Sequence, residues 1–152
     1  MTRFLLDVMC GGLTSYLRLC GHDTVYALDR DGEDDDRLLA IAADERRKLV
    51  TRDVHLSNRA DDAVLLRQRE TEDQLAELAA AGVSLTPTDV PTRCGRCNGP
   101  VERVAEGSST PEYAPDDDTP TWRCRDCGQC FWRGSHWDRM CATLERVRAG
   151  QG

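Results

Sequence analysis

The sequence lacks long apolar runs, and none of its hydrophobic stretches approaches the roughly twenty residues that a membrane-spanning helix needs. The N-terminal stretch RFLLDVMCGG is too short, and too soon interrupted by Asp7, to resemble an export signal. We therefore expect no contact with a membrane and a cytoplasmic location, where thiols stay reduced.

Lysine is almost absent, since Lys48 is the single one and arginine supplies the other basic side chains. Residues 1–91 carry 11 basic and 18 acidic side chains, whereas residues 92–152 carry 9 of each, within a net charge of −7. An acidic surface repels nucleic acid, and arginine binds phosphate and stacks on bases better than lysine does. The C-terminal part is therefore the better candidate for contact with RNA.

Four of the eight cysteines form two Cys-x-x-Cys pairs: Cys94, Cys97, Cys124 and Cys127. Two cysteines at this spacing can direct both sulfurs at one ion from a tight turn, so two such turns complete a tetrahedral zinc site. Gly95 or Gly128 beside the ligands would permit the unusual backbone angles of these turns. The alternative is a redox pair or a set of disulfides, and the lack of a stretch that resembles a secretory signal disfavours it.

The other four cysteines are expected to be plain thiols: Cys10, Cys20, Cys130 and Cys141. Cys10 and Cys20 lie among apolar neighbours, as small core residues do. Cys130 follows the second pair closely and is an alternative zinc ligand.

Strand-like and helix-like patterns alternate in the first part of the chain. Predicted strands cover residues 3–8, 24–28, 48–51 and 63–67. Predicted helices cover about 13–20, 34–47, 54–59 and 71–82, with Thr71 capping the last one toward Gln74. Parallel neighbours need a crossover helix, so the alternation predicts an α/β fold with a parallel sheet flanked by helices.

A linker and a polar insert complete the predicted organisation. The segment VSLTPTDVPT holds two prolines, and we place a boundary near Pro91 between a first domain (1–91) and a zinc ribbon (92–152). Residues 101–121, between the two cysteine pairs, hold three prolines and the acidic run Asp116, Asp117 and Asp118. We expect this insert to be a solvated loop rather than a metal site.

Three aspartates fall at or beside the carboxyl ends of predicted strands, where open parallel sheets bind their ligands. Asp7 follows FLL in the first strand, Asp53 follows the third strand, and Asp35 opens the helix that leads into the third strand. Converging carboxylates repel one another unless a divalent cation neutralises them, and oxygen ligands suit magnesium or manganese. The pattern therefore predicts a metal site of the kind that activates water against a phosphodiester.

Two of these aspartates also have a purely structural interpretation. Asp35 would be favoured at a helix start by the helix dipole, and Asp53 would cap the helix that begins at Val54. Asp7 has no comparable alternative, because a carboxylate inside an apolar strand loses hydration unless it meets a cation or hydrogen-bond donors.

The stretches DVMCGGLTSYLRLCGHD, DDDRLLAIAADERRKLVTRDVHL and WRCRDCGQCFWRGSHW resemble the Mut-seven C-terminal ribonuclease family, a branch of the PIN-domain nucleases with a zinc ribbon. The resemblance covers nearly the whole chain. It implies a PIN-like domain that cleaves single-stranded RNA with metal ions held by aspartates. Asp7 matches the first acidic position and the stretch 35–53 resembles the later pair, with Asp34 or Asp36 as alternatives to Asp35.

Four further side chains are candidates for RNA contact: Arg18, Arg52, Arg133 and His136. The first two would hold phosphates near the acidic pocket, and His136 lies in an aromatic cluster that would stack on unpaired bases. The alternative is structural, with paired arginines and with aromatic side chains that pack the ribbon onto the first domain.

The expected function is thus a magnesium- or manganese-dependent endoribonuclease with a structural zinc ribbon. A non-catalytic RNA-binding or protein-binding module is the alternative, because Glu33 is only a weak match to the glutamate that many PIN nucleases carry between the first and third acidic positions. A phosphatase with Asp7 as its nucleophile would need a second aspartate two residues on, where the sequence has Met9.

Overall fold

A parallel β-sheet forms the centre of the first part of the chain in the computed structural model, which describes residues 2–115 and 118–151. The strands are β1 (Arg3–Leu6), β2 (Asp23–Tyr26), β3 (Lys48–Thr51) and β4 (Ala63–Leu65). They lie in the order β2-β1-β3-β4, and every neighbouring pair is parallel. The predicted α/β fold with a parallel sheet is confirmed.

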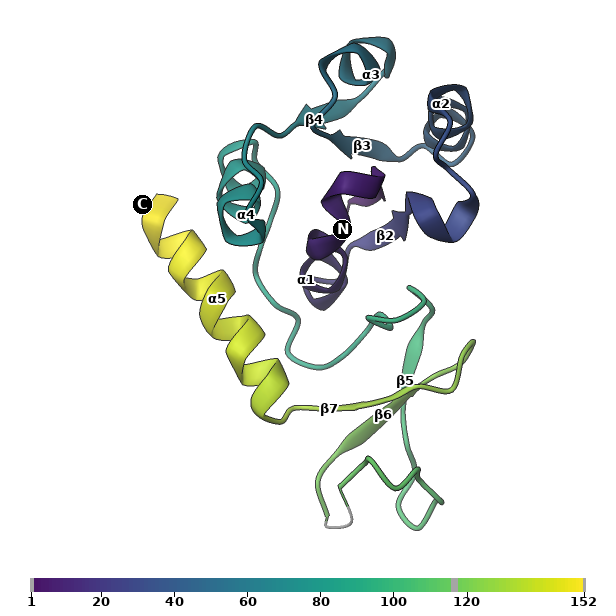
Figure 1. Cartoon of the computed structure of the whole chain (residues 1–152). Helices are drawn as coiled ribbons and strands as arrows, with labels where there is room; N and C mark the ends of the chain where they lie inside the picture. Colours follow the sequence, from purple (N-terminus) through teal and green to yellow (C-terminus); the bar gives the residue numbers. More distant parts are fainter. Residues whose placement is uncertain (1, 116–117, 152) are drawn as a thin grey trace.

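Helices follow the strands and cover both faces of this sheet (Figure 1). They are α1 (Thr14–Leu19), α2 (Asp35–Asp44), α3 (Val54–Arg59) and α4 (Thr71–Ala80), with 3₁₀ helices over Val8–Leu13 and Ala27–Arg30.

The strands carry apolar side chains on both faces, as a sheet covered on both sides requires. In β1, Phe4 and Leu6 belong to a cluster with Leu17 of α1, whereas Leu5 belongs to a second cluster with Leu38 of α2. The two helical layers therefore bury opposite sides of the same strand.

Several predicted boundaries differ from the structure. The strands predicted at 3–8, 24–28 and 63–67 end earlier, at Leu6, Tyr26 and Leu65. After β1 and β2 the chain turns at once into a 3₁₀ helix, and such a turn leaves no alternation in the sequence. The predicted cap Thr71 is wrong, because Glu70 is the N-cap of α4 and makes no side-chain capping bond. By contrast, β3 and α3 have their predicted bounds.

A second, antiparallel sheet forms the ribbon, and a long helix follows it. The strands β5 (Val101–Arg103), β6 (Thr121–Cys124) and β7 (Cys130–Trp132) lie in this order. Helix α5 (Ser135–Gln151) was missed by the sequence analysis. Its buried residues Met140, Leu144 and Val147 recur at helical spacing, a pattern that would have predicted it.

Helix α5 packs back against α4, which flanks the parallel sheet (Figure 1). Leu144 and Val147 join the same core cluster as Phe4, and Arg148 Nη1 donates a hydrogen bond of 2.7 Å to Leu85 O. The end of the chain thus shares a core with its beginning, while the division at Pro91 stays a prediction.

Two sequence expectations concern membrane-spanning helices and the polar insert. Within residues 2–115 and 118–151, no helix is both long and apolar enough to cross a membrane. The insert predicted at 101–121 is shorter in the structure, because residues 101–103 form β5 and Thr121 begins β6. The described residues between these strands form neither helix nor strand, and Asp116 and Asp117 lie outside the described residues.

The ribbon is joined to the edge of the sheet at β2. Asn98 Oδ1 accepts a hydrogen bond of 2.9 Å from Thr24 N, and Asn98 Nδ2 donates one of 2.7 Å to Asp23 Oδ1. Arg47 Nη1 donates to the same Asp23 oxygen over 2.8 Å. Burial raises the pKa of Asp23, but the bonds from Asn98 and Arg47 outweigh it and hold the pKa below its usual value.

A buried histidine next to this edge predicts a pH-dependent stability. His22 is 3% exposed, its Nδ1 accepts a bond of 3.0 Å from Thr2 N, and its Nε2 lies 2.7 Å from Ser84 O. The ring is therefore neutral with its proton on Nε2. Burial lowers its pKa, and the bond to Ser84 O only partly opposes this.

We expect the folded protein to lose stability as the pH falls below about 6.5, because the unfolded chain then binds a proton on His22 that the folded chain does not. The variant His22→Gln should lose less stability than the wild type between about pH 7.5 and about pH 5.5. Urea unfolding of zinc-loaded protein at both pH values measures this. His55 and His136 are exposed and are common to both proteins. An equal loss in wild type and variant would contradict the prediction.

Candidate active site and metal centre

Asp7 lies at the carboxyl end of β1 and is 6% exposed. Its Oδ1 accepts a hydrogen bond of 2.7 Å from Val8 N, and its Oδ2 accepts one of 2.6 Å from the Thr51 hydroxyl. Its backbone N–H continues the sheet by donating to Val50 O over 2.9 Å. These donors replace hydrogen bonds to water that the carboxylate loses on burial, and they fix its position at the end of the strand.

Asp53 lies at the same edge, two residues beyond β3. Its Oδ1 accepts a bond of 3.1 Å from Leu56 N, so it is the N-cap of α3, as one alternative held. Its backbone N–H donates to Thr51 Oγ1 over 3.0 Å. Thr51 thus joins the two aspartates, and Asp53 Oδ2 makes no hydrogen bond to any described residue.

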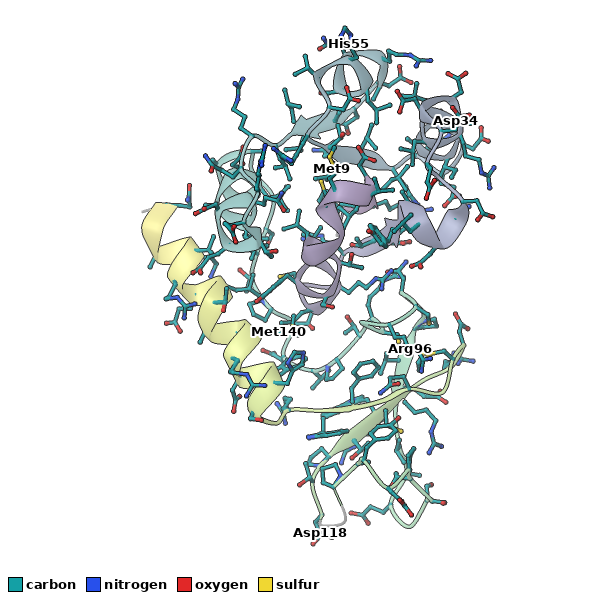
Figure 2. The ribbon with its side chains drawn as sticks, viewed as in Figure 1. Met9, Asp34, His55, Arg96, Asp118 and Met140 are labelled. Carbon is teal, nitrogen blue, oxygen red and sulfur yellow. The ribbon has the colours of Figure 1, made fainter. Side chains whose placement is uncertain are left out.

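Asp35 is the first residue of α2 and is half-buried, while Asp34 occupies the N-cap position. Figure 2 labels Met9, Asp34 and His55, which lie one or two residues from Asp7, Asp35 and Asp53 in the sequence. All three labelled residues lie in the part of the molecule away from the ribbon. Among residues 2–115 and 118–151, only the four paired cysteines bring three or more potential metal ligands together. The structure therefore links Asp7 to Asp53 but does not bring Asp35 into one group with them.

Arg52 lies between Thr51 and Asp53 and brings a positive charge to this edge. Its Nε is buried and has no hydrogen-bond partner among the described residues. This charge acts on the nearby Cys10. Burial and the negative charge of Asp7 raise the pKa of the Cys10 thiol to about 12, and the positive charge of Arg52 opposes them only in part. Cys10 is therefore a neutral, buried core thiol, as predicted, and is no nucleophile at neutral pH.

Thr51 is the residue of this site that the sequence analysis overlooked. It is fully buried, donates to Asp7 and accepts from the Asp53 backbone. The only signal in the sequence was its place in the TRD motif. A threonine at the end of an apolar strand is common and does not by itself indicate a site.

The four paired cysteines come together at the end of the ribbon, with all four sulfurs within 4.8 Å of one another. Cys94 Sγ lies 3.6 Å from Cys127 Sγ, and Cys97 Sγ lies 3.5 Å from Cys124 Sγ. Four sulfurs at about 2.3 Å from a central zinc ion would be about 3.8 Å apart in a tetrahedron. The group therefore has the size and ligand type of a zinc site.

Backbone turns of one kind present these sulfurs. Arg96 N donates to Cys94 Sγ over 3.3 Å, and Asp126 N donates to Cys124 Sγ over 3.4 Å. The fourth residue after the first cysteine of each pair has a positive φ, 73° at Asn98 and 80° at Gly128. The prediction for Gly128 is confirmed, but Asn98 rather than Gly95 has the left-handed backbone in the first turn.

The remaining cysteines lie outside this group. Cys130 is buried, and its Sγ lies 3.9 Å from Gly128 O, so the alternative of Cys130 as a ligand is not supported. Cys20 packs against the core cluster of the sheet, as predicted.

The predicted RNA-contacting side chains have different surroundings. Arg18 is 3% exposed, donates to Thr24 O from Nε and Nη2, and donates to Gly95 O from Nη1 over 2.9 Å. It therefore bridges α1, β2 and the ribbon, which favours its structural alternative. Arg133 is exposed, and its guanidinium lies 5.6 Å from the centre of the Trp122 ring. Their role in RNA binding stays a prediction.

Among known proteins, one family model matches this chain. Residues 2–144 match the model of the family described as Mut7-C RNAse domain. No curated protein and no solved structure gave a significant match. The family match spans both the sheet with its Asp7–Thr51–Asp53 chain and the cysteine ribbon, so the chain belongs to the Mut7-C RNAse domain family.

Proposed function

We propose that this protein is a metal-dependent endoribonuclease that hydrolyses single-stranded RNA at the carboxyl edge of its parallel sheet. The observation that carries the proposal is the chain from Asp7 through the Thr51 hydroxyl to Asp53, in a member of an RNase family. Thr51 Oγ1 donates to the buried Asp7 carboxylate and accepts from the Asp53 backbone N–H, so one side chain fixes both acidic residues at the same edge of the sheet, where a cation could be held between them.

The oxygen donors at this edge suit a magnesium or manganese ion. Asp7 accepts one hydrogen bond on each oxygen, and a carboxylate has about four lone-pair sites, so both of its oxygens retain acceptor capacity. Asp53 Oδ2 is not used by the described residues. Asp7 and Asp53 would hold the ion, and Asp35 would approach from α2. An ion bound there supplies a Lewis acid that lowers the pKa of water and stabilises the leaving oxygen.

The protein's own residues have separate tasks in this proposal. Thr51 fixes the Asp7 carboxylate, and Arg52, whose Nε has no hydrogen-bond partner among the described residues, would bring a positive charge toward a phosphate oxygen. Water oxygen attacks phosphorus, the P–O3′ bond breaks, and a proton reaches the departing 3′ oxygen. The products are a 3′-hydroxyl and a 5′-phosphate, because the ribose 2′-hydroxyl is not the nucleophile.

The zinc site is proposed to be structural. Cys94, Cys97, Cys124 and Cys127 would fill all four positions of a tetrahedral ion, which leaves no place for water or substrate. The ion would hold the two turns of the ribbon together.

A non-catalytic binding module is the second candidate. It is favoured by one observation, that Asp7, Asp35 and Asp53 do not form a three-carboxylate group in the described structure. In that case the ribbon would supply recognition and the acidic edge would be inert.

Metal-dependent cleavage of a labelled, unstructured RNA separates these functions. We expect zinc-loaded protein to cut this RNA when manganese is added and not when divalent ions are omitted, with 5′-phosphate at the new ends. Zinc content is measured in both samples, so that loss of the ribbon is not mistaken for loss of the catalytic ion. Products with 2′,3′-cyclic phosphate, or no cleavage by folded protein, would refute the proposal.

A further inference from the structure

A cleft of about 450 Å³ lies where the ribbon meets the first domain. Its walls come from one side of α1, residues 91–96, β7 and the first two turns of α5. In Figure 2 the labelled residues Arg96 and Met140, which both line it, stand on the ribbon and on α5. This volume lies in the range of about 300–1,000 Å³ typical of small-molecule sites.

The charge of this cleft is opposite to that of the whole chain. Its lining includes Arg18, Arg93, Arg96 and His136, and none of the described residues that line it is acidic. Arg18 is buried and Arg93 Nη2 lies 3.8 Å from Asp23 Oδ2, so the exposed Arg96 is the arginine best placed to meet a ligand. The chain as a whole has a net charge of −7. A concave, positive site on an acidic protein selects an anionic ligand, because the surrounding acidic surface repels anions elsewhere.

Aromatic rings are concentrated at the same place. The chain has only eight aromatic side chains of the Phe, Trp and Tyr types, and Phe131, Trp132 and Trp137 all line the cleft. All three are half-buried, and Trp132 is held by stacking on Tyr113 at 6.1 Å between ring centres. Partly exposed rings beside arginines bind flat, weakly hydrated groups such as nucleobases.

We propose that this cleft binds one unstacked nucleotide of single-stranded RNA, with the base against the aromatic rings and the phosphate beside Arg96. This inference rests on the proposed function, because it makes the occupant a part of the RNA substrate. An acidic peptide would match the charge but would give the aromatic rings nothing flat to stack on.

The position of the cleft defines what it does for the reaction. The ribbon is attached at Asp23 and Thr24, which pair with Arg3 and Phe4 at the amino end of β1. Asp7 lies three or four residues further along, roughly 10–13 Å in the strand direction. The cleft therefore holds a nucleotide away from the bond that is cut, and contributes to substrate binding rather than to the chemical step.

Three variants test this proposal. Arg96→Ala and Trp137→Ala alter the cleft, and Arg139→Ala removes an exposed arginine of α5 outside it. Binding of a short labelled RNA is measured without added magnesium or manganese, and thermal unfolding and zinc content show that each variant is folded. We expect the Kd to rise about tenfold in both cleft variants and to stay unchanged in Arg139→Ala.

Competition identifies the ligand chemistry. Adenosine 5′-monophosphate should displace the RNA and quench tryptophan fluorescence, whereas inorganic phosphate at the same concentration should not. Equal displacement by inorganic phosphate would overturn the proposal in favour of a simple anion site. Displacement by a polyglutamate peptide but not by the nucleotide would overturn it in favour of an acidic protein segment.

Cleavage kinetics separate this proposal from the nuclease proposal. In the cleft variants we expect a higher KM with an unchanged kcat. Cleavage with wild-type KM in both variants would refute the cleft and leave the nuclease standing. RNA binding that depends on Arg96 and Trp137 in a protein that never cleaves would support the cleft and refute the nuclease.

Discussion

Replacing Asp7 by asparagine should abolish metal-dependent RNA cleavage while the protein stays folded. The substitution removes the negative charge at the centre of the proposed metal site. Changes to residues that only orient metal ligands cost about 10- to 100-fold, so loss of a ligand should cost at least about 100-fold in kcat. Initial rates with manganese, measured on zinc-loaded protein, give this value.

The fold should tolerate the Asp7→Asn substitution. The amide oxygen of the new side chain would still accept from Val8 N, and its NH₂ group would donate to the Thr51 hydroxyl, which has two acceptor sites and uses one for Asp53 N. Asp61→Asn is the matched control, because Asp61 is exposed and lies beyond α3, away from the proposed site. Near wild-type cleavage by Asp7→Asn, or an equal loss in Asp61→Asn, would remove Asp7 from the active site.

The parallel sheet could be predicted because its strands are short, apolar and separated by helix-like segments. The KLVT strand and the helix after it were placed correctly, since Lys48 and Asp53 bound them with polar residues. The ends of the other strands were not, because local hydrogen bonds that start 3₁₀ helices leave no periodicity in the sequence. Helix α5 was overlooked because it follows directly on the ribbon, although its apolar spacing is regular.

The candidate site was predictable in part for a related reason. Residues at the carboxyl ends of adjacent parallel strands must meet, so Asp7 and Asp53 could be paired from the sequence. Asp35 belongs to a helix whose distance from the sheet depends on packing, and periodicity does not give this distance. The role of Thr51 depends on one hydroxyl rotamer. The burial of Arg18 could not be predicted because its partners are backbone carbonyls, Thr24 O and the distant Gly95 O, and a carbonyl leaves no mark in the sequence.

Removing zinc should unfold the ribbon while the sheet domain stays folded. The strands β5, β6 and β7 are three or four residues long. The described part of the ribbon has few buried side chains, which are Cys94, Ala114, Thr121, Trp122, Cys124 and Cys130. Such a sheet has too little apolar burial to fold alone, and a structural zinc ion contributes about 10–16 kcal/mol in small zinc domains. Cys127→Ser should act like chelation, because it removes one ligand.

The distribution of tryptophan makes this loss measurable. All three tryptophans, Trp122, Trp132 and Trp137, lie in the ribbon or in the first turn of α5, so their emission reports this part alone. We expect a red shift of the emission on chelation, with most of the helical circular dichroism retained. Zinc added back should reverse the shift in wild type but not in Cys127→Ser.

Helix α5 connects the ribbon to the core of the sheet, so its helical signal shows whether the unfolding reaches beyond the ribbon. Leu144 and Val147 are buried in the core cluster of the sheet, so this half of α5 should stay helical after the ribbon has unfolded. Cys141→Ser is the control, since Cys141 is half-buried on α5 and belongs to neither cysteine pair. Unchanged tryptophan emission after complete zinc removal would show that the ribbon folds without metal. A red shift that is accompanied by loss of the helical signal would show that ribbon and sheet unfold as one cooperative unit. The hydrogen bonds of Arg18 and Asn98 between the two parts would then be strong enough to make the sheet depend on the folded ribbon.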